Sequence, residues 1–254
     1  MFDVYNFGSG SSGNSTLVSD GETTILIDIG LSLSRIKNGI KNAGYNVEDI
    51  KAILITHLHT DHAKPVGLNH FERSLMYGCF VHKEYPNTNY IEPLVPFQVG
   101  TLRIIPLLAS HDDWDVDSTI GFRIENKLGE VLVYLTDTGY VPEENIELIA
   151  NANIYMFESN HDLETLRFYS SYPHQTIERI DSEVGHLSNY DSAIALFYSS
   201  GPNTKQIVLL HLSIENNTPQ LALQEFTRIF RNDSRKSEIK IDVARPEEVT
   251  HFKW

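Results

Sequence analysis

The amino-acid sequence contains a single cysteine, Cys79, among 254 residues, so no disulfide bond can form within the chain. This scarcity suits a reducing compartment. The sequence also lacks any apolar run near the ~20 residues that a membrane-spanning helix needs. Its first residues, MFDVYNF, lack the basic and apolar regions of a signal peptide. We therefore expect a cytoplasmic protein that does not bind a membrane.

Basic residues are also scarce. The chain has 20 Lys and Arg residues against 34 Asp and Glu residues, which gives a formal net charge of −14. This balance argues against a protein that coats nucleic acid, because neutralisation of phosphates by Lys and Arg supplies most of that affinity. It does not exclude a phosphodiester substrate, since bound divalent cations would supply positive charge where the phosphate binds.

The chain is predicted to form one α/β domain over residues 1–254, because it shows no internal repeat, no charge block and no linker. Residues 23–29 and 50–55 have the composition of buried strands. Between them, Leu33, Ile36 and Ile40 recur at helical spacing. This strand–helix–strand order is typical of an α/β fold. Residues 2–7 are expected to form an edge strand, and residues 239–243 the last strand.

The stretch ILITHLHTDH at residues 53–62 predicts a metal site. A short buried strand leads directly into His57, His59, Asp61 and His62. On an extended backbone His57 and His59 would point to the same side, and the two residues after them lie where the chain must turn. Imidazole and carboxylate groups are ligands suited to zinc, manganese or iron.

Three further predicted strands end in potential ligands: residues 102–108 lead to His111, residues 131–135 to Asp137 and residues 206–210 to His211. A sheet gathers its strand ends along one edge, where sites are usually built. The number of ligands fits two metal ions, and the absence of a thiolate makes manganese acceptable. In this assignment His57, His59 and His111 bind the first metal, Asp61, His62 and His211 bind the second, and Asp137 bridges them.

A run of small residues, GSGSSGNS at residues 8–15, joins two predicted strands near the start of the chain. Small residues let the backbone approach a ligand closely. The run is not a P-loop, because no Gly-Lys-Ser/Thr ends it. We predict that Ser11, Ser12 and Asn14 hold phosphate oxygens of a substrate, through backbone N–H groups.

The HxHxDH motif at residues 57–62, followed in order by His111, Asp137 and His211, resembles the metallo-β-lactamase fold family. The resemblance implies a four-layer αβ/βα sandwich, in which two mixed sheets pack face to face with helices outside. It also implies that Asp28 orients a metal ligand. A β-lactam hydrolase is not implied, since those enzymes typically use Cys in place of the bridging carboxylate.

Six longer words are similar to the YycJ/WalJ-type bacterial nucleases: GSGSSGN (8–14), SHD (110–112), DTGYV (137–141), ESNHD (158–162), GHLSN (185–189) and HLSIENN (211–217). This resemblance implies phosphodiester hydrolysis, notably exonuclease action on DNA, with two divalent metal ions, Zn²⁺ or Mn²⁺. The segment HQTIE at residues 174–178 is less basic than is typical of that family, so RNA and other substrates stay open.

In the expected mechanism, a hydroxide that bridges the two metals attacks phosphorus. Asp61 and His186 are the predicted catalytic side chains. His186 would contact the phosphate or protonate the leaving oxygen, with simple packing next to a helix cap as the alternative. His161 and Ser188 are predicted to contact the substrate. Two other functions stay open: a phosphodiesterase of small cyclic nucleotides, and a metal-binding regulator without turnover. A homodimer is also open.

Overall fold

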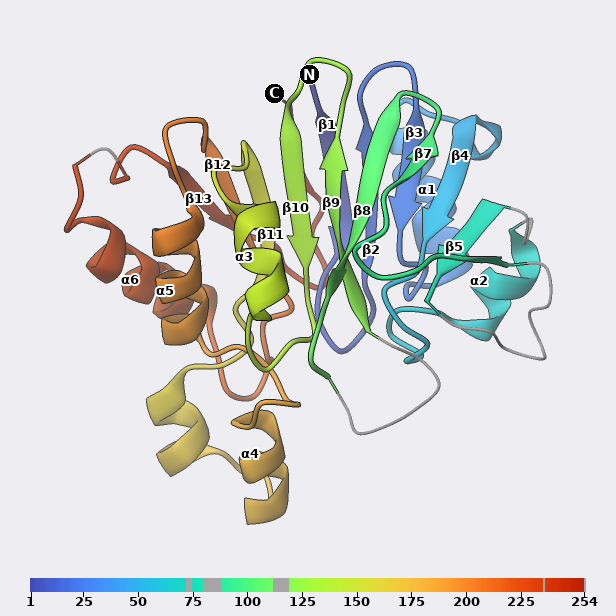
Figure 1. Ribbon diagram of the computed structural model, residues 1–254. Helices are drawn as coiled ribbons and strands as arrows, with labels where there is room; N and C mark the ends of the chain where they lie inside the picture. The colour runs from blue at the N-terminus through green and yellow to red at the C-terminus, as the bar shows by residue number, and fades with distance from the viewer. Residues whose placement is uncertain (72–74, 80–87, 112–118, 235, 254) are drawn as a thin grey trace.

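The structure is a computed structural model that describes residues 1–254 except 72–74, 80–87, 112–118, 235 and 254. Two mixed sheets stand side by side in the middle of the molecule, with helices on their outer faces (Figure 1). The predicted four-layer αβ/βα sandwich is therefore confirmed. Among the described residues, no helix is both long enough and apolar enough to cross a membrane.

The first sheet has seven strands in the order β14-β1-β2-β3-β4-β5-β6. Strands β3 to β6 run parallel to one another, whereas β14, β1, β2 and β3 pair antiparallel in turn. The strands are β1 (Asp3–Gly8), β2 (Ser15–Ser19), β3 (Thr24–Ile27), β4 (Ile50–Leu54), β5 (Met76–Gly78), β6 (Asn89–Tyr90) and β14 (Thr250–Lys253).

The second sheet also has seven strands, in the order β13-β12-β11-β10-β9-β8-β7. Strands β10 to β13 are parallel, and β7 to β10 pair antiparallel. The strands are β7 (Phe97–Val99), β8 (Leu102–Leu108), β9 (Ile120–Glu125), β10 (Val131–Leu135), β11 (Ile154–Glu158), β12 (Gln206–Leu210) and β13 (Lys240–Val243).

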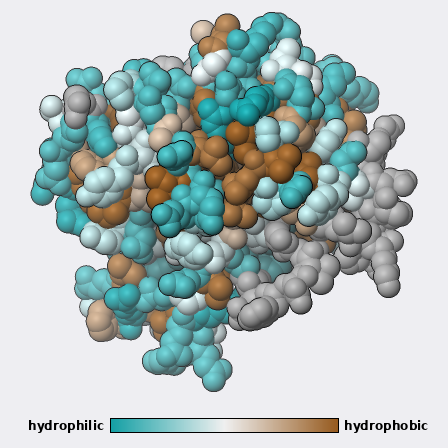
Figure 2. Space-filling view, in the orientation of Figure 1, coloured by the Kyte–Doolittle hydropathy of each residue, from teal (hydrophilic) through white to brown (hydrophobic). Residues whose placement is uncertain are grey.

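The helical elements are α1 (Leu33–Asn42), α2 (Pro65–His70), α3 (Ile146–Ile149), α4 (His174–Ile180), α5 (Asn189–Ser199), α6 (Pro219–Phe230), the 3₁₀ turns η1 (Val47–Asp49) and η3 (Glu143–Asn145), and the π-helical turn η4 (Thr165–Tyr169). Of these, η4 and α4 lie on a small lobe that extends below the sandwich in Figure 1. Figure 2 shows hydrophobic residues gathered over β8 and β9 and beside α3.

Strand β3 illustrates how one short apolar stretch builds two layers of the core. Its residues alternate in direction, because successive side chains of a strand point to opposite faces. Ile25 and Ile27 join the cluster between the two sheets, whereas Leu26 packs with Ile36 and Ile40 of α1 on the outer face. A strand covered on both faces is apolar throughout, as residues 23–29 are.

Two predictions about strand order were wrong. Strand β1 is not at the edge, because β14 pairs with it antiparallel from Asp3 with Lys253 to Asn6 with Thr250. The chain continues past β13 and returns to the first sheet, so β13 is not the last strand. Strand β14 has only four residues, and of its described side chains only Phe252 is buried, which leaves no apolar run to mark it.

Candidate metal centre

Several strands of both sheets end at one edge of the sandwich, and the residues just beyond them converge on one point. Asp28, Asp137 and His211 follow β3, β10 and β12, and each has a positive φ, of 60°, 57° and 57°. Left-handed backbone at residues other than glycine is strained and clusters at functional sites. In this protein the left-handed backbone occurs at three residues that follow a strand and contribute a side chain to the centre.

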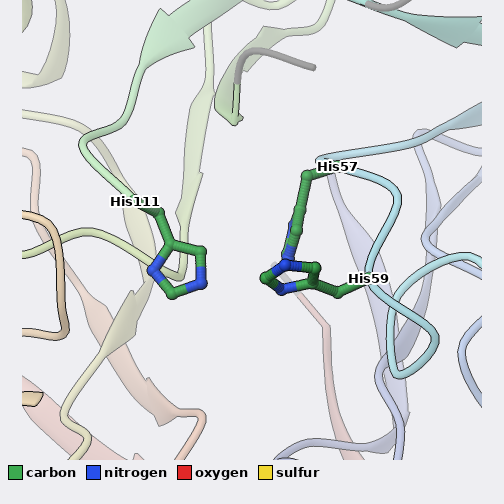
Figure 3. Close-up of side chains that lie close together, drawn as sticks. All are labelled: His57, His59 and His111. Carbon is green, nitrogen blue, oxygen red and sulfur yellow. The ribbon is translucent and has the colours of Figure 1, made fainter. Parts of the chain in front are cut away.

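The first predicted ligand group comes together from both sheets. Figure 3 shows His57 and His59, which follow β4, facing His111, which follows β8. The ring centroids of His57 and His59 are 4.5 Å apart, and the His111 centroid lies 5.5 Å and 5.3 Å from theirs. One ring nitrogen from each residue lies within 4.8 Å of the other two. This spacing fits three ligands of one metal ion.

The second predicted group consists of Asp61, His62 and His211, with ligand atoms that likewise lie within 4.8 Å of one another. Asp61 Oδ2 is 3.5 Å from His62 Nε2 and 3.7 Å from His211 Nε2. His62 and His211 are buried, whereas the Asp61 side chain is 23% exposed. A ligand bound at this group would therefore meet solvent on the side of Asp61.

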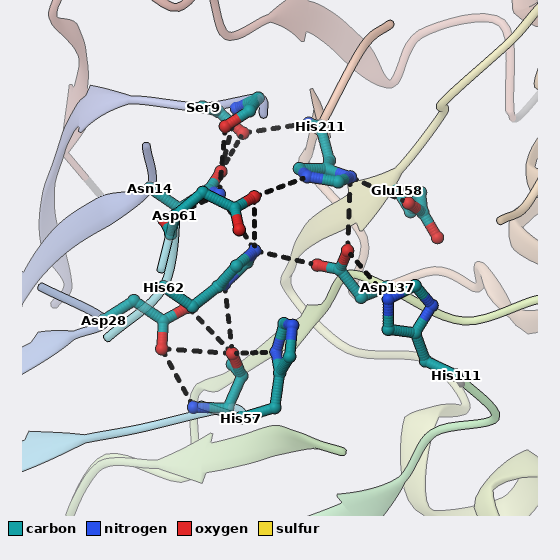
Figure 4. Close-up of polar contacts among 12 residues, drawn as sticks. Ser9, Asn14, Asp28, His57, Asp61, His62, His111, Asp137, Glu158 and His211 are labelled. Carbon is teal, nitrogen blue, oxygen red and sulfur yellow. Dashed lines mark hydrogen bonds and ion pairs between the residues drawn. The ribbon is translucent and has the colours of Figure 1, made fainter. Parts of the chain in front are cut away.

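The carboxylate of Asp137 lies between the two groups, as Figure 4 shows. Its Oδ2 is 3.1 Å from His62 Nε2, while its Oδ1 is 3.9 Å from His111 Nε2 and 3.5 Å from His211 Nδ1. The structure thus brings all seven predicted ligands together and puts Asp137 in the position that a bridging ligand would need.

Four of the histidines have the Nδ1 atom engaged by the surrounding protein. His62 Nδ1 donates to Asp28 Oδ2 at 2.7 Å and His111 Nδ1 donates to the Gly185 carbonyl at 3.1 Å. His57 Nδ1 lies 3.1 Å from Thr56 Oγ1, and His211 Nδ1 lies 3.1 Å from a carboxylate of β11. Metal-binding histidines typically show this arrangement, in which one ring nitrogen is fixed and the other is left for the metal.

That carboxylate of β11 belongs to Glu158, which the sequence reasoning did not select. Glu158 is fully buried, and its Oε1 accepts from His186 Nδ1 at 2.8 Å and from His211 Nδ1 at 3.1 Å. Its Oε2 accepts from the backbone N–H of Thr138 at 2.9 Å. The sequence did contain a signal for Glu158, because residues 153–157 form another apolar strand and Glu158 is the charged residue that follows.

The electrostatics of the centre favour a bound cation. Burial acts to lower the pKa of His62, but the carboxylates of Asp137 and Asp28 outweigh it and raise this pKa to about 10. Burial likewise acts to raise the pKa of Glu158, but the neighbouring His186 and His211 lower it to about 2. The buried carboxylates therefore require positive charge close by, and protons on imidazoles are one source of it.

Divalent cations would be a second source, and the residues present fit them. Among the described residues, two buried ring nitrogens at the centre make no hydrogen bond: His57 Nε2 and His211 Nε2. Leaving buried polar atoms without partners is costly, so such atoms call for a missing partner. Imidazole nitrogens and carboxylate oxygens without thiolates are suited to Zn²⁺ or Mn²⁺.

The glycine-rich loop at residues 8–14 supports the centre through Asn14. The buried Asn14 side chain lies 2.9 Å from His62 Nε2, and its Oδ1 accepts from the Gly10 N–H at 2.8 Å. The Asn14 N–H donates to the Asp61 carbonyl, and the Gly30 N–H donates to the Asn14 carbonyl. A Cβ on Gly30 would lie 1.6 Å from the Asp61 carbonyl oxygen, so only glycine fits between these segments.

The other predicted substrate contacts lie in different surroundings. Ser11 and Ser12 are exposed on the loop. His161 is buried, with Nε2 4.0 Å from Asp181 Oδ1, and burial lowers its pKa to about 4. Ser188 is buried, and its hydroxyl accepts from the Asp191 N–H as the N-cap of α5. The last residue of the SHD word, Asp112, lies outside the described residues.

His186 lies at the mouth of the centre. Its side chain is 18% exposed, and its ring centroid is 4.8 Å from that of His111 and 5.3 Å from that of His211. Nδ1 is held by Glu158 and lies 3.7 Å from Asp137 Oδ1. A histidine that is fixed on one side and accessible to solvent can exchange a proton with a bound molecule.

Comparisons with known proteins agree with this geometry. Residues 23–212 match the family described as the Beta-lactamase superfamily domain. The metallo-β-lactamase fold protein YhfI from Bacillus subtilis superposes with a TM-score of 0.72 at 17% identity, and the match covers 99% of both chains. The protein therefore belongs to the β-lactamase superfamily and has the metallo-β-lactamase fold.

Two curated relatives define a narrower group. Exodeoxyribonuclease YycJ of Bacillus anthracis is 33% identical over 241 residues, which is 87% of this chain and 86% of the relative. Exodeoxyribonuclease WalJ of Streptococcus pneumoniae serotype 2 is 36% identical over 227 residues, covering 84% of this chain and 82% of the relative. The chain belongs to the family of YycJ and WalJ, which confirms the resemblance seen in the sequence.

Proposed function

We propose that this protein is a metal-dependent nuclease that hydrolyses phosphodiester bonds, with DNA as the substrate and attack from a strand end. The observation that carries the proposal is the pair of ligand groups with Asp137 between them. Two relatives that match most of the chain are named exodeoxyribonucleases, which supports DNA as the substrate.

The proposed centre has two cations, Zn²⁺ or Mn²⁺. His57, His59 and His111 would hold one, Asp61, His62 and His211 the other, and Asp137 would contact both. When bound, such a pair supplies a hydroxide nucleophile at neutral pH and neutralises the charge that develops on the phosphate.

The chain's own residues have three tasks in this proposal. Asp61, the partly exposed carboxylate of the second group, accepts the proton of the attacking water. His186 donates a proton to the leaving oxygen, and Glu158 holds its ring through Nδ1 at 2.8 Å. Asp28 fixes His62 from the opposite side through a hydrogen bond of 2.7 Å. Each carboxylate that orients a histidine is buried, so these geometries are preorganised.

The test is hydrolysis of end-labelled single- and double-stranded DNA by purified protein, supplied with Mn²⁺ or Zn²⁺, with labelled RNA in parallel. We expect DNA to be shortened progressively from an end. Asp137→Ala should abolish the reaction, and His186→Ala should slow it by about 10² to 10⁴-fold, the usual contribution of a general acid.

His251→Ala is a matched control, because the His251 side chain is 46% exposed on β14 and contacts Asp3 and Tyr5, away from the centre. It should leave the rate unchanged. Intact oligonucleotides after incubation with the metal-loaded protein would contradict the proposal, as would an Asp137→Ala variant with full activity.

A second candidate is a phosphodiesterase of small cyclic nucleotides at the same centre. The net charge of −14 favours it, since a small substrate makes few contacts with the acidic surface. Cleavage of a 2′,3′-cyclic nucleotide together with intact oligonucleotides would establish this function. Binding of metal without hydrolysis of either substrate would indicate a regulator.

A further inference from the structure

A largely apolar pocket of about 580 Å³ lies on the His211 side of the metal centre. Its apolar walls include Leu212, Ile214, Pro219 and Pro246. This volume falls within the range of about 300–1,000 Å³ that is typical of small-molecule sites. None of these residues takes part in the chemistry described above, so the pocket needs its own explanation.

The pocket is continuous with two segments that build the centre. Leu212 follows the predicted ligand His211 directly in the chain, and His211 N–H donates to Ser9 Oγ of the glycine-rich loop at 2.8 Å. Ser12 of the same loop lines the pocket, two residues before Asn14, which contacts His62. Both segments therefore place the pocket next to residues that build the centre.

One wall of the pocket is tied to the centre by Arg35. Its guanidinium donates to the carbonyl of Phe7 at 2.6 Å and also to the carbonyl of Pro246. Phe7 precedes the glycine-rich loop, and Pro246 lines the pocket. This bridge joins segments that are far apart in the chain, so the pocket is formed before a ligand arrives.

A second pocket, of about 360 Å³, flanks the centre on the His186 side, but its lining differs. Three carboxylates, Asp181, Glu183 and Asp191, contribute to it. An acidic lining disfavours a nucleotide, which carries its own negative charge. The pocket beside Leu212 also has two carboxylates, Glu247 and Glu248, but they pair with Arg35 and Arg245 at 3.5 Å and 2.7 Å. Its lining is therefore less acidic than that of the second pocket, which His186 also lines.

We propose that the pocket beside Leu212 holds the nucleobase of the substrate nucleotide that adjoins the scissile phosphate. The inference rests on the proposed function and adds which part of the substrate the protein binds outside the metal centre. Ile214, Pro219 and Pro246 present apolar surface that can pack against a base without reading its sequence, as a nuclease of broad specificity requires. Ser12, Ser213 and Gln220 supply polar groups at the pocket for the sugar or the base edge.

The first test is calorimetric titration of the metal-loaded protein with thymidine 5′-monophosphate and, separately, with inorganic phosphate. We expect the nucleotide to bind more tightly than phosphate. Ile214→Asp should weaken nucleotide binding by about tenfold, the lower range for loss of contact with one base. Because the Ile214 side chain is 71% exposed, this substitution should not prevent folding.

Ile146→Asp is the matched control, because Ile146 is 54% exposed on α3 and does not line this pocket. Its affinity for the nucleotide should equal that of the wild type. Equal binding of nucleotide and phosphate by the wild type would overturn the proposal, and so would an Ile214→Asp variant with unchanged nucleotide affinity.

A second measurement separates the pocket from the chemistry. The p-nitrophenyl ester of thymidine 5′-monophosphate contains a base, whereas bis(p-nitrophenyl) phosphate does not. We expect Ile214→Asp to lower kcat/KM for the thymidine ester relative to kcat/KM for bis(p-nitrophenyl) phosphate. If the protein hydrolyses neither ester but Ile214→Asp still weakens nucleotide binding, the proposed function fails while the pocket assignment stands.

Discussion

Replacement of Asp28 by asparagine should weaken metal binding without disturbing the fold. Asp28 is fully buried, and its carboxylate accepts from two directions: Oδ1 from the Thr56 N–H at 2.8 Å, and Oδ2 from His62 Nδ1 at 2.7 Å. Asparagine has one acceptor oxygen and one donor nitrogen, so it can satisfy only one of these partners. It also tolerates the left-handed backbone at this position, where φ is 60°.

If the amide nitrogen of the substituted side chain faces His62, it donates to Nδ1 and forces the ring proton onto Nε2. Nε2 is the atom that lies 3.1 Å from Asp137 Oδ2 and that would bind the metal. Loss of such an orienting partner usually lowers metal affinity by about 10- to 100-fold, or about 1.4 to 2.8 kcal/mol.

The assay is competition for Zn²⁺ between the protein and a chromophoric chelator. Asp20→Asn is the matched control, since Asp20 accepts hydrogen bonds in the β2–β3 turn, away from the centre. We expect weaker affinity for one cation in Asp28→Asn and no change in the control. Unchanged affinity for both cations in Asp28→Asn would refute the role assigned to Asp28.

Three further outcomes are expected. Asp137→Asn should lower kcat/KM by at least about 10²-fold, and metal analysis should show that fewer cations are retained; full activity would contradict a shared ligand. Gly30→Ala should lower the free energy of unfolding by about 3 kcal/mol or more, measured with denaturant, because the new Cβ meets the Asp61 carbonyl. Burial acts to raise the pKa of Asp20, but hydrogen bonds from Thr101 and from the backbone outweigh it and lower this pKa. Asp20 therefore stabilises the fold above its unfolded pKa of about 3.9 and loses this effect in acid. Asp20→Ala should cost about 1 kcal/mol at pH 7 and less below pH 4; a cost that does not depend on pH would contradict this assignment.

The sequence predicts which residues converge at one edge of the sheets, because the rule behind the prediction is simple. Apolar strands that end in His or Asp are easy to recognise, and parallel strands bring their ends to one edge. His111 and His211 are 100 residues apart in the sequence, yet a ring nitrogen of each lies within 4 Å of Asp137 Oδ1 in the structure. The fold class follows from the same alternation of strands and helices.

Other features depend on tertiary structure and leave little trace in the sequence. Glu158 ends a strand like the other site residues, but a lone glutamate has no characteristic spacing, and only its contacts with His186 and His211 reveal its place. The left-handed backbone at Asp28 and Asp137 is a second such feature, since these residue types adopt it only in some settings. Strand β14 was missed because a four-residue edge strand with one buried side chain has almost no apolar pattern.

The most direct test of the account is a crystal structure of the metal-loaded protein with anomalous diffraction data at the absorption edge of the bound metal. We expect two anomalous peaks about 3.5–4 Å apart, the separation of a two-metal site. One peak should lie among His57, His59 and His111, the other beside His62 and His211, with Asp137 in contact with both. A single peak, or peaks away from these residues, would contradict it.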